Sequence, residues 1–327
     1  MGKIRWGIIA PGHIARGFTA GLKVLENAEL YAVASRNLAT ANAFANEFGF
    51  KKAFGSYAEL ADDKDVDVIY IASPHHLHFE NTLMCLEKGK AVLCEKPFTI
   101  NSKQLQILVK TAREKKVFLM EALWTRFLPN IEKTLELIKN NHIGNVKMLN
   151  ADFGFKADYN PQSRLFDPFL GGGSLLDIGI YPVFLSLLIL GYPDEIQAVA
   201  SKAPTGVDES MSISLRYKSG AIASLHCTFA THTTTDANIY GDKGKIQLKH
   251  QWFRPTTLFV SKHNEIAEEL NFPAEANGYE YEAEEVMNCL NSGMTESKVL
   301  GLDFSLQLME LLDSIRMKCN IVYKDYD

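Results

Sequence analysis

The chain has 327 residues, of which 46% are hydrophobic and 22% charged, and its formal net charge is −5. A single core rarely grows to this length, so we expect two domains, and 34 Lys and Arg against 39 Asp and Glu without a basic run exclude a nucleic-acid partner. Five scattered cysteines without metal-ligand spacing predict a reducing, cytoplasmic setting. The apolar runs are interrupted before about 18 residues, so neither a signal peptide nor a membrane span is expected.

Short apolar runs alternate with amphipathic stretches through the first part of the chain. We expect strands at residues 4–10, 30–34, 66–72, 91–94 and 117–120, and helices at 14–25, 39–48, 76–88 and 102–115. Such alternation predicts right-handed βαβ units in a doubly wound parallel sheet. Residues 1–121 are therefore expected to form a Rossmann dinucleotide-binding domain.

The regular alternation of predicted strands and helices ends after residue 121. We therefore assign residues 122–327 to a second domain. Helices are expected at 131–140, 174–190, 279–290 and 303–317, and strands at 146–155, 197–202, 211–217, 221–229, 234–240, 245–248 and 257–260. Closely spaced strands joined by short turns predict an α+β domain with a predominantly antiparallel open sheet and helices on one face.

The first strand ends in a glycine-bearing turn, Ala10-Pro11-Gly12-His13-Ile14-Ala15. It follows the G-x-G-x-x-G/A fingerprint with alanine at the first and third glycine positions. Gly12 would let a pyrophosphate approach the backbone, and the helix starting near His13 would offer N–H groups and a positive dipole end. Ala10, Gly12, His13 and Ile14 are the first cofactor-binding candidates, although an ordinary βα turn is the alternative.

The end of the second strand indicates which dinucleotide is bound. Enzymes that use NAD usually place Asp or Glu there, whereas this chain has Ser35 and Arg36. A hydroxyl and a guanidinium suit a 2′-phosphate, so NADP(H) is preferred and NAD(H) remains possible. A solvated arginine next to a loop is the alternative interpretation of Arg36.

Three histidines follow the third predicted strand in the run Ser73-Pro74-His75-His76-Leu77-His78. They suggest a metal, but carboxylate and cysteine ligands are missing nearby and two adjacent histidines cannot share a helix face. We predict no metal site. Instead, Ser73 and Pro74 are expected to line the cofactor channel, while His75 or His78 makes polar contacts at the start of the following helix. All four residues are candidates for cofactor binding.

Charged residues end the fourth predicted strand, where Glu95, Lys96 and Pro97 follow the apolar residues 91–94. Ligands of open α/β sheets bind at the carboxyl ends of strands, so an ammonium and a carboxylate there can orient a substrate and move protons.

Downstream, Asp177 and Tyr181 stand four residues apart in an apolar helix preceded by the glycines 171–173. They would share one helix face, and a carboxylate among apolar neighbours needs a partner or a role. The alternative is a structural aspartate beside a core tyrosine.

These motifs together resemble the glucose-fructose oxidoreductase/inositol dehydrogenase/MocA (Gfo/Idh/MocA) family over nearly the whole chain. The similarity is greatest to its branch of dimeric dihydrodiol dehydrogenases and NADP-dependent D-xylose 1-dehydrogenases. The segments that carry it are residues 5–15, 34–36, 92–97, 120–127 and 172–181. The wider family usually has histidine where this chain has Tyr181, and glycine where it has Ala10.

The resemblance implies a dehydrogenase that acts on CH–OH groups of a sugar or cyclic diol. Tyr181 would be the acid/base, Lys96 the cation that favours its phenolate form, and Asp177 a group that orients Lys96 or a substrate hydroxyl. Glu95 would hold the nicotinamide ribose. Further contacts are implied for Lys96, Trp124 and Arg126 with the cofactor, and for Lys96, Trp124, Phe153, Asp177, Tyr181 and Trp252 with the substrate. Arg126 could also form part of the substrate wall, and Trp252 could equally be a core residue.

Other interpretations remain open at this point. The chain could be a sensor that binds NADP(H) without catalysis, because one fold can serve both uses. It could also be a dehydrogenase of an inositol or a nucleotide sugar. A homodimer formed through the C-terminal sheet is expected from the resemblance, since it would cover apolar residues on an open sheet face.

Overall fold

The computed structural model describes residues 2–327, which form two compact units. Unit 1 comprises Met1–Arg126 and Ala274–Leu306, and unit 2 comprises Phe127–Pro273 and Gln307–Asp327. The sequence analysis assigned residues 274–306 to the second domain. They return to unit 1 because helix α8 (Tyr279–Asn291) packs on helix α1 (His13–Lys23), where Gly21 lies close to the backbone of Glu280.

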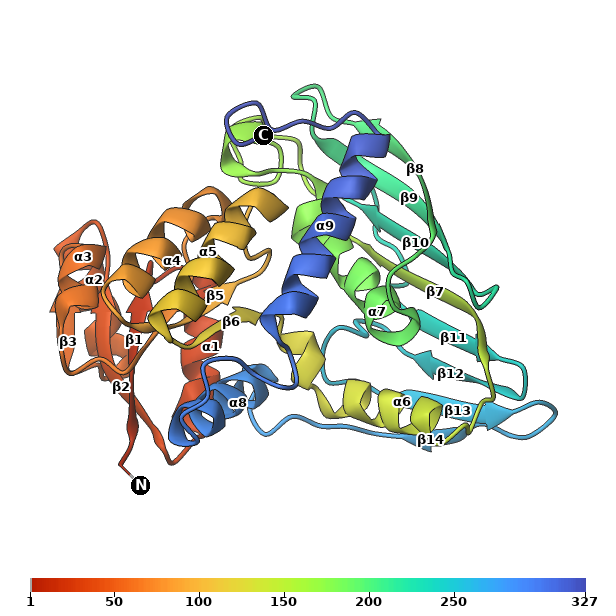
Figure 1. Ribbon diagram of the computed structural model, residues 1–327, viewed down its shortest axis with the longest axis horizontal. Helices are drawn as coiled ribbons and strands as arrows, with labels where there is room; N and C mark the ends of the chain where they lie inside the picture. The colour runs from red at the N-terminus through yellow and green to blue at the C-terminus, as the bar shows by residue number, and fades with distance from the viewer. Residues whose placement is uncertain (1) are drawn as a thin grey trace. The chain divides into compact units, whose positions relative to one another are not determined.

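Unit 1 is built on a parallel sheet in the order β3-β2-β1-β4-β5-β6 (Figure 1). Its strands are β1 (Ile4–Ile9), β2 (Ala28–Ala34), β3 (Lys52–Phe54), β4 (Val68–Ile71), β5 (Ala91–Glu95) and β6 (Leu119–Ala122). Its other helices are α2 (Leu38–Phe48), α3 (Tyr57–Asp62), α4 (His78–Glu87) and α5 (Ser102–Lys115). This order is that of the dinucleotide-binding fold, and the strand order reverses between β1 and β4. The predicted Rossmann sheet is confirmed.

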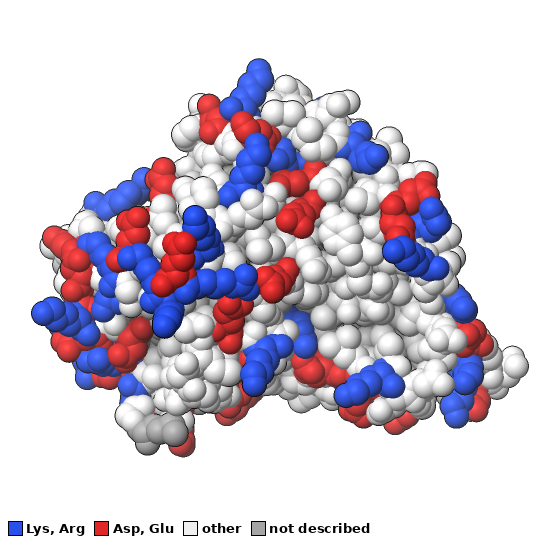
Figure 2. All heavy atoms as spheres, in the orientation of Figure 1, with Lys and Arg blue, Asp and Glu red and all other residues white. Residues whose placement is uncertain are grey.

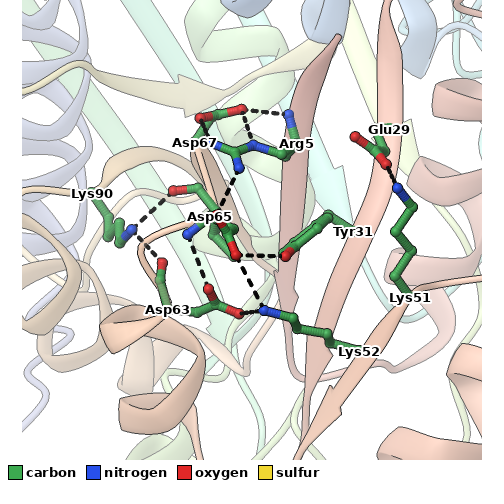
Figure 3. A network of polar contacts seen from close by, with 10 residues as sticks. Arg5, Glu29, Tyr31, Lys51, Lys52, Asp63, Asp65, Asp67 and Lys90 are labelled. Carbon is green, nitrogen blue, oxygen red and sulfur yellow. Dashed lines mark hydrogen bonds and ion pairs between the residues drawn. The ribbon is translucent and has the colours of Figure 1, made fainter.

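Ion pairs tie together the strand starts of unit 1 (Figure 3). Arg5 at the start of β1 pairs with Asp67 at 2.9 Å and with Asp65 at 3.0 Å, and Lys52 at the start of β3 pairs with Asp63 at 2.8 Å. Because solvent screens these partly exposed pairs, they contribute little to stability. They lie at the amino ends of the strands, so the carboxyl ends, where ligands bind, are on the opposite edge of the sheet.

Unit 2 contains a sheet in the order β14-β13-β12-β11-β7-β10-β9-β8, in which β7 and β10 are parallel and the other neighbours antiparallel. The strands are β7 (Val146–Gly154), β8 (Glu195–Lys202), β9 (Asp208–Arg216), β10 (Ile222–Thr228), β11 (Ala237–Gly241), β12 (Gly244–Leu248), β13 (Leu258–Lys262) and β14 (Glu268–Leu270). Helices α6 (Pro129–Lys139) and α7 (Ile180–Leu190) lie on the same side of this sheet (Figure 1). In β9 the side chains of Met211, Ile213 and Leu215 face the core and alternate with exposed ones. The predicted mainly antiparallel sheet with helices on one face is confirmed.

One segment of unit 2, Pro168–Leu190, is long and apolar enough to cross a membrane, with a mean hydropathy of 1.9. The sequence analysis counted only uninterrupted apolar residues and did not single out this segment. In the structure 83% of its most apolar window is buried, because α7 packs across β7 and β10. That burial is what the core helix of a globular unit shows.

The surface of unit 1 carries both signs of charge. On the face drawn in Figure 2, Lys and Arg side chains alternate with Asp and Glu over its helices. Mixed charge of this kind creates no long single-sign field on that face.

Candidate functional site

The turn after β1 leaves room beside its glycine. Ala10 adopts a φ of 64°, the left-handed conformation that usually selects glycine, which accounts for the family preference at this position. A Cβ built on Gly12 would have the Ala10 carbonyl oxygen, 3.9 Å away, as its nearest neighbour among the described residues. Internal packing therefore does not require this glycine. Its bare backbone, with the exposed His13 and half-buried Ile14 that begin α1, suits the pyrophosphate of a dinucleotide.

Arg36 is exposed at the carboxyl end of β2 and has an aromatic partner that the sequence analysis missed. Burial raises the pKa of Tyr57, and the nearby Arg36 guanidinium opposes this shift through its charge and a hydrogen bond. The adjacent Asn37 caps α2 by accepting from the Ala39 N–H at 2.8 Å, while the Ser35 hydroxyl accepts from the Asn37 N–H at 3.3 Å. The β2 end thus presents a guanidinium that Tyr57 helps to orient.

His78 joins two strand-end loops. It is 1% exposed, with Nδ1 lying 2.8 Å from the Pro97 carbonyl oxygen and Nε2 2.7 Å from that of Ser73. Both carbonyls accept hydrogen bonds and would favour a doubly protonated ring, but burial is the larger effect and lowers the pKa of His78 to about 4. At neutral pH the ring therefore donates to one carbonyl at a time. His78 thus makes the predicted polar contacts at the start of α4, with both ring nitrogens directed at the protein backbone. Its contact with a cofactor stays a prediction.

The other residues of this loop are more accessible. Pro74 is exposed and His75 half-buried, with the His75 ring 5.6 Å from that of His78. Ser73 is 5% exposed, and its hydroxyl accepts from the Asn81 side chain at 3.0 Å. Among residues 2–327, no group of three or more His, Cys, Asp or Glu side chains is arranged to hold a metal ion.

Two buried carboxylates hold the backbone at and after Lys96. The Glu95 carboxylate accepts from the Lys96 N–H at 3.2 Å and from the Tyr70 hydroxyl. On the other side, Glu121 of β6 accepts from the Phe98 N–H at 3.1 Å, and burial raises the pKa of Glu121 to about 7. These anchors fix the loop at the carboxyl end of β5, and the Lys96 side chain is partly exposed. A fixed loop restricts where the Lys96 ammonium can lie, and substrate orientation requires such a restriction.

Trp124 packs within unit 1. Its ring is 4% exposed and stacks on Tyr279, with centroids 4.4 Å apart and planes 17° apart. Arg126 follows on the same short helical segment and is partly exposed. The contacts with cofactor and substrate assigned to these two residues stay predictions.

In unit 2, Asp177 and Tyr181 are placed by a wide helical turn. Leu175–Gly179 forms a π-helical turn that leads directly into α7, and such turns are frequent at functional sites. The start of this segment is fixed by Asp208, which accepts from the Ser174 hydroxyl at 2.8 Å and the Leu175 N–H at 2.6 Å. Gly173, with a φ of 122°, is needed because its Cβ would lie 2.4 Å from the Asp208 carboxylate. The bonds to Asp208 of β9 therefore fix the start of the helical segment that carries Asp177 and Tyr181.

Aromatic rings surround Tyr181, which is 5% exposed. Phe153 of β7 lies 5.6 Å from it and Phe253 5.1 Å, and these two phenylalanines stack with their centroids 4.1 Å apart. Phe153 was predicted here, whereas Phe253 was missed. Trp252, the adjacent residue, is fully buried and donates to the Asp152 carbonyl at 2.9 Å, which fits the core alternative. Its contact with the substrate stays a prediction.

The guanidinium of Arg164 pairs with Asp177, with 2.8 Å between Nη1 and Oδ1. The sequence analysis did not identify Arg164, since it lies in the polar loop before the glycines. A carboxylate, a guanidinium and a phenol are therefore grouped beside an aromatic wall in unit 2. Such a group can bind hydroxyls and transfer a proton.

The Rossmann sheet, the bare glycine turn and the charged β5 end define a dinucleotide-dependent oxidoreductase. Comparison with known proteins gives the family. Residues 4–123 match the "oxidoreductase family, NAD-binding Rossmann fold" model, and residues 131–247 match the GFO/IDH/MocA C-terminal domain. The chain belongs to the Gfo/Idh/MocA family.

Its relatives include proteins of similar length. Trans-1,2-dihydrobenzene-1,2-diol dehydrogenase is 39% identical over 334 residues in Mus musculus and 37% over 330 residues in Homo sapiens, with 98% of both chains covered in each comparison. A 3-ketoreductase from Actinomadura kijaniata, solved with NADP and TDP-benzene, has a TM-score of 0.87 at 27% identity, covering 97% of this chain and 98% of that one. An aldose-aldose oxidoreductase from Caulobacter crescentus shares the fold, with a TM-score of 0.89 at 21% identity and 97% of each chain covered.

Proposed function

We propose that this protein is an NADP-dependent dehydrogenase that interconverts a hydroxyl and a carbonyl on a sugar or cyclic diol. The observation that carries the proposal is the grouping of Asp177 and Tyr181 beside the Phe153 ring in unit 2. Ring faces suit the apolar faces of a cyclic polyol, and the polar groups suit its hydroxyls. The near full-length similarity to dihydrodiol dehydrogenases supports the same substrate class.

In this proposal the two units supply different parts of the chemistry. Gly12 and the start of α1 hold the pyrophosphate, Arg36 the 2′-phosphate and Glu95 the nicotinamide ribose. The nicotinamide, when bound, accepts or donates a hydride. Tyr181 removes the hydroxyl proton in the oxidation direction and returns it in the reduction direction, and Lys96 provides a positive charge that favours the phenolate. Asp177 orients a cation or a substrate hydroxyl.

A single set of assays tests this function. Absorbance of the reduced nicotinamide is followed with NADP and NAD in parallel, across pentoses, hexoses, inositols and a trans-dihydrodiol. We expect turnover with NADP on at least one aldose or diol. Tight NADP binding without turnover on any of these compounds would favour a sensor. Turnover confined to inositols would identify the protein as an inositol dehydrogenase instead.

Arg36→Ala is expected to reduce the preference for NADP. Charge-assisted hydrogen bonds to a phosphate are worth about 1.5–3 kcal/mol, so the ratio of kcat/KM for NADP to that for NAD should fall by about ten- to a hundredfold. Arg113→Ala on α5, which removes a guanidinium paired with Glu296 at 2.8 Å, is the control and should leave the ratio unchanged. Equal efficiency with both cofactors in the wild type, unaffected by Arg36→Ala, would contradict the assignment.

We also propose a homodimer through the open face of the unit 2 sheet. Met148, Val199 and Ile222 are 43%, 72% and 41% exposed, and the strand register places them on one face with the small side chains of Ser212 and Ser214. An open sheet face with exposed apolar residues is suited to association with its own copy.

Sedimentation at micromolar concentration should therefore give twice the monomer mass of 36.6 kDa. Val199→Lys should shift the protein toward monomer, whereas Ile266→Lys, at a residue 97% exposed outside that face, should not. A wild-type monomer would rule out the stable dimer.

A further inference from the structure

Arg164 is a basic residue of unit 2 that pairs with Asp177, the carboxylate four residues before the candidate acid/base Tyr181. Its Nη1 atom lies 2.8 Å from Oδ1 of Asp177, whose side chain is 9% exposed, while the Arg164 side chain is 58% exposed. The Asp177 charge and, more weakly, that of Tyr181 raise the pKa of Arg164. The guanidinium therefore interacts electrostatically with both groups.

The loop that carries Arg164 is fixed on both sides of this residue. The Ser163 carbonyl accepts from the Phe166 N–H at 3.1 Å and from the Asp167 N–H at 2.9 Å, and the Leu165 carbonyl accepts from the Gly173 N–H at 2.9 Å. Phe166 is fully buried and packs on Phe229, with ring centroids 5.7 Å apart. The backbone around Arg164 is thus bonded to the start of the helical segment that carries Asp177 and Tyr181.

Other charged or titratable groups described near this helical segment have partners other than Asp177. Cys227 of β10 accepts or donates a hydrogen bond with Ser174 at 3.3 Å, and burial raises the pKa of its thiol, which keeps it neutral. The Arg254 guanidinium lies 5.6 Å from the centroid of the Phe253 ring. Asp152 accepts from the Thr235 N–H at 2.8 Å. Among these groups Arg164 is the one that pairs with Asp177, four residues before Tyr181 on the same helical segment.

We propose that Arg164 is a positioning residue that orients Asp177 and supplies, within unit 2, a positive charge that favours the phenolate form of Tyr181. This inference rests on the proposed function, since it explains how Tyr181 would serve as a base. Coupling between two ionisable groups is reciprocal: if ionised Tyr181 stabilises the Arg164 cation, the cation stabilises the phenolate equally. The alternative is an ion pair that only fastens the loop to the helical segment and leaves the ionisation of Tyr181 unchanged.

The two sides of the ion pair predict effects of opposite sign. Removing the cation in Arg164→Gln should lower the ionisation constant of Tyr181 by about tenfold. Removing the anion in Asp177→Asn leaves the cation unshielded and should raise that constant by about threefold. Arg164→Lys keeps the charge without the planar fork and should restore part of the loss.

Titration of the tyrosines measures this directly and needs no turnover. The protein is labelled with ¹³C at the tyrosine ζ carbon, and the Tyr181 resonance is assigned by its loss in Tyr181→Phe. Its titration is then compared in the full-length wild type, Arg164→Gln, Arg164→Lys and Asp177→Asn. Arg113→Gln on α5, which also breaks a guanidinium–carboxylate pair, is the matched control and should titrate like the wild type.

Kinetics provide the second readout. With the substrate found in the assays above, Arg164→Gln should lower kcat/KM about tenfold at neutral pH and regain it at alkaline pH, because more Tyr181 is then ionised. A uniform loss at every pH would indicate structural damage and would overturn the inference. So would identical Tyr181 titrations in the wild type and Arg164→Gln, even if the enzyme is active. Absence of turnover in the wild type would overturn the proposed function, and the titration would still decide the role of Arg164.

Discussion

Tyr181→Phe is expected to lower turnover by about 10²- to 10⁴-fold, the usual contribution of a positioned acid/base group. The substitution removes one hydroxyl and keeps the ring, which Phe153 and Phe253 contact at 5.6 and 5.1 Å. Packing in unit 2 should therefore be retained, so the loss reports on proton transfer. Initial rates of NADP reduction at saturating substrate, from neutral to alkaline pH, provide the measurement.

Two measurements separate this expectation from a general defect. NADP binding, followed by quenching of protein fluorescence, should be nearly unchanged, because the residues proposed to hold the cofactor belong to unit 1. Tyr192→Phe removes a hydroxyl from an exposed tyrosine beyond the end of α7 and should keep full turnover. Turnover of Tyr181→Phe within a few-fold of the wild type would show that another group carries the proton.

The sequence predicted the fold well where strands are buried on both faces. Strands β1, β4 and β5 consist largely of apolar residues, and such continuous runs between amphipathic helices are typical of a parallel sheet. The missed elements are short or polar. Strand β3 has 3 residues and α3 has 6, and β14 reads Glu-Glu-Leu, so each depends on its neighbours for stability more than on its own pattern.

Topology predicted the cofactor side of the candidate site, and helical spacing predicted Asp177 and Tyr181. Gly12, Arg36 and Lys96 follow strands, and the carboxyl ends of parallel strands share one edge of the sheet. Arg164 and Tyr57 were missed because their roles come from partners distant in the sequence, and a single loop arginine carries no periodic signal.

Two of the predicted contact residues are buried. His78 makes the polar contacts expected at the start of α4, and Trp252 fits the core alternative, each with ring nitrogens directed at backbone carbonyls. An aromatic or imidazole ring can satisfy its polar atoms inside the protein, and sequence does not distinguish that case from a ligand contact.

Lys96→Met is expected to lower turnover by about 10²-fold or more while NADP still binds. Methionine keeps an unbranched side chain of similar length and removes only the ammonium. The loop should keep its shape, because Glu95 accepts from the residue 96 N–H at 3.2 Å and Glu121 from the Phe98 N–H at 3.1 Å, and neither bond involves the side chain of residue 96. The loss should therefore reflect substrate orientation and the missing positive charge.

The pH dependence of Lys96→Met tells the two roles of this ammonium apart. If Lys96 mainly favours the phenolate of Tyr181, activity should recover at alkaline pH, as is expected for Arg164→Gln, and the double variant should need a still higher pH. If Lys96 mainly orients the substrate hydroxyl, KM should rise and turnover should stay low at every pH. Lys96→Arg, which retains charge in a different geometry, should then remain impaired as well. Wild-type rates in Lys96→Met would remove Lys96 from the mechanism altogether.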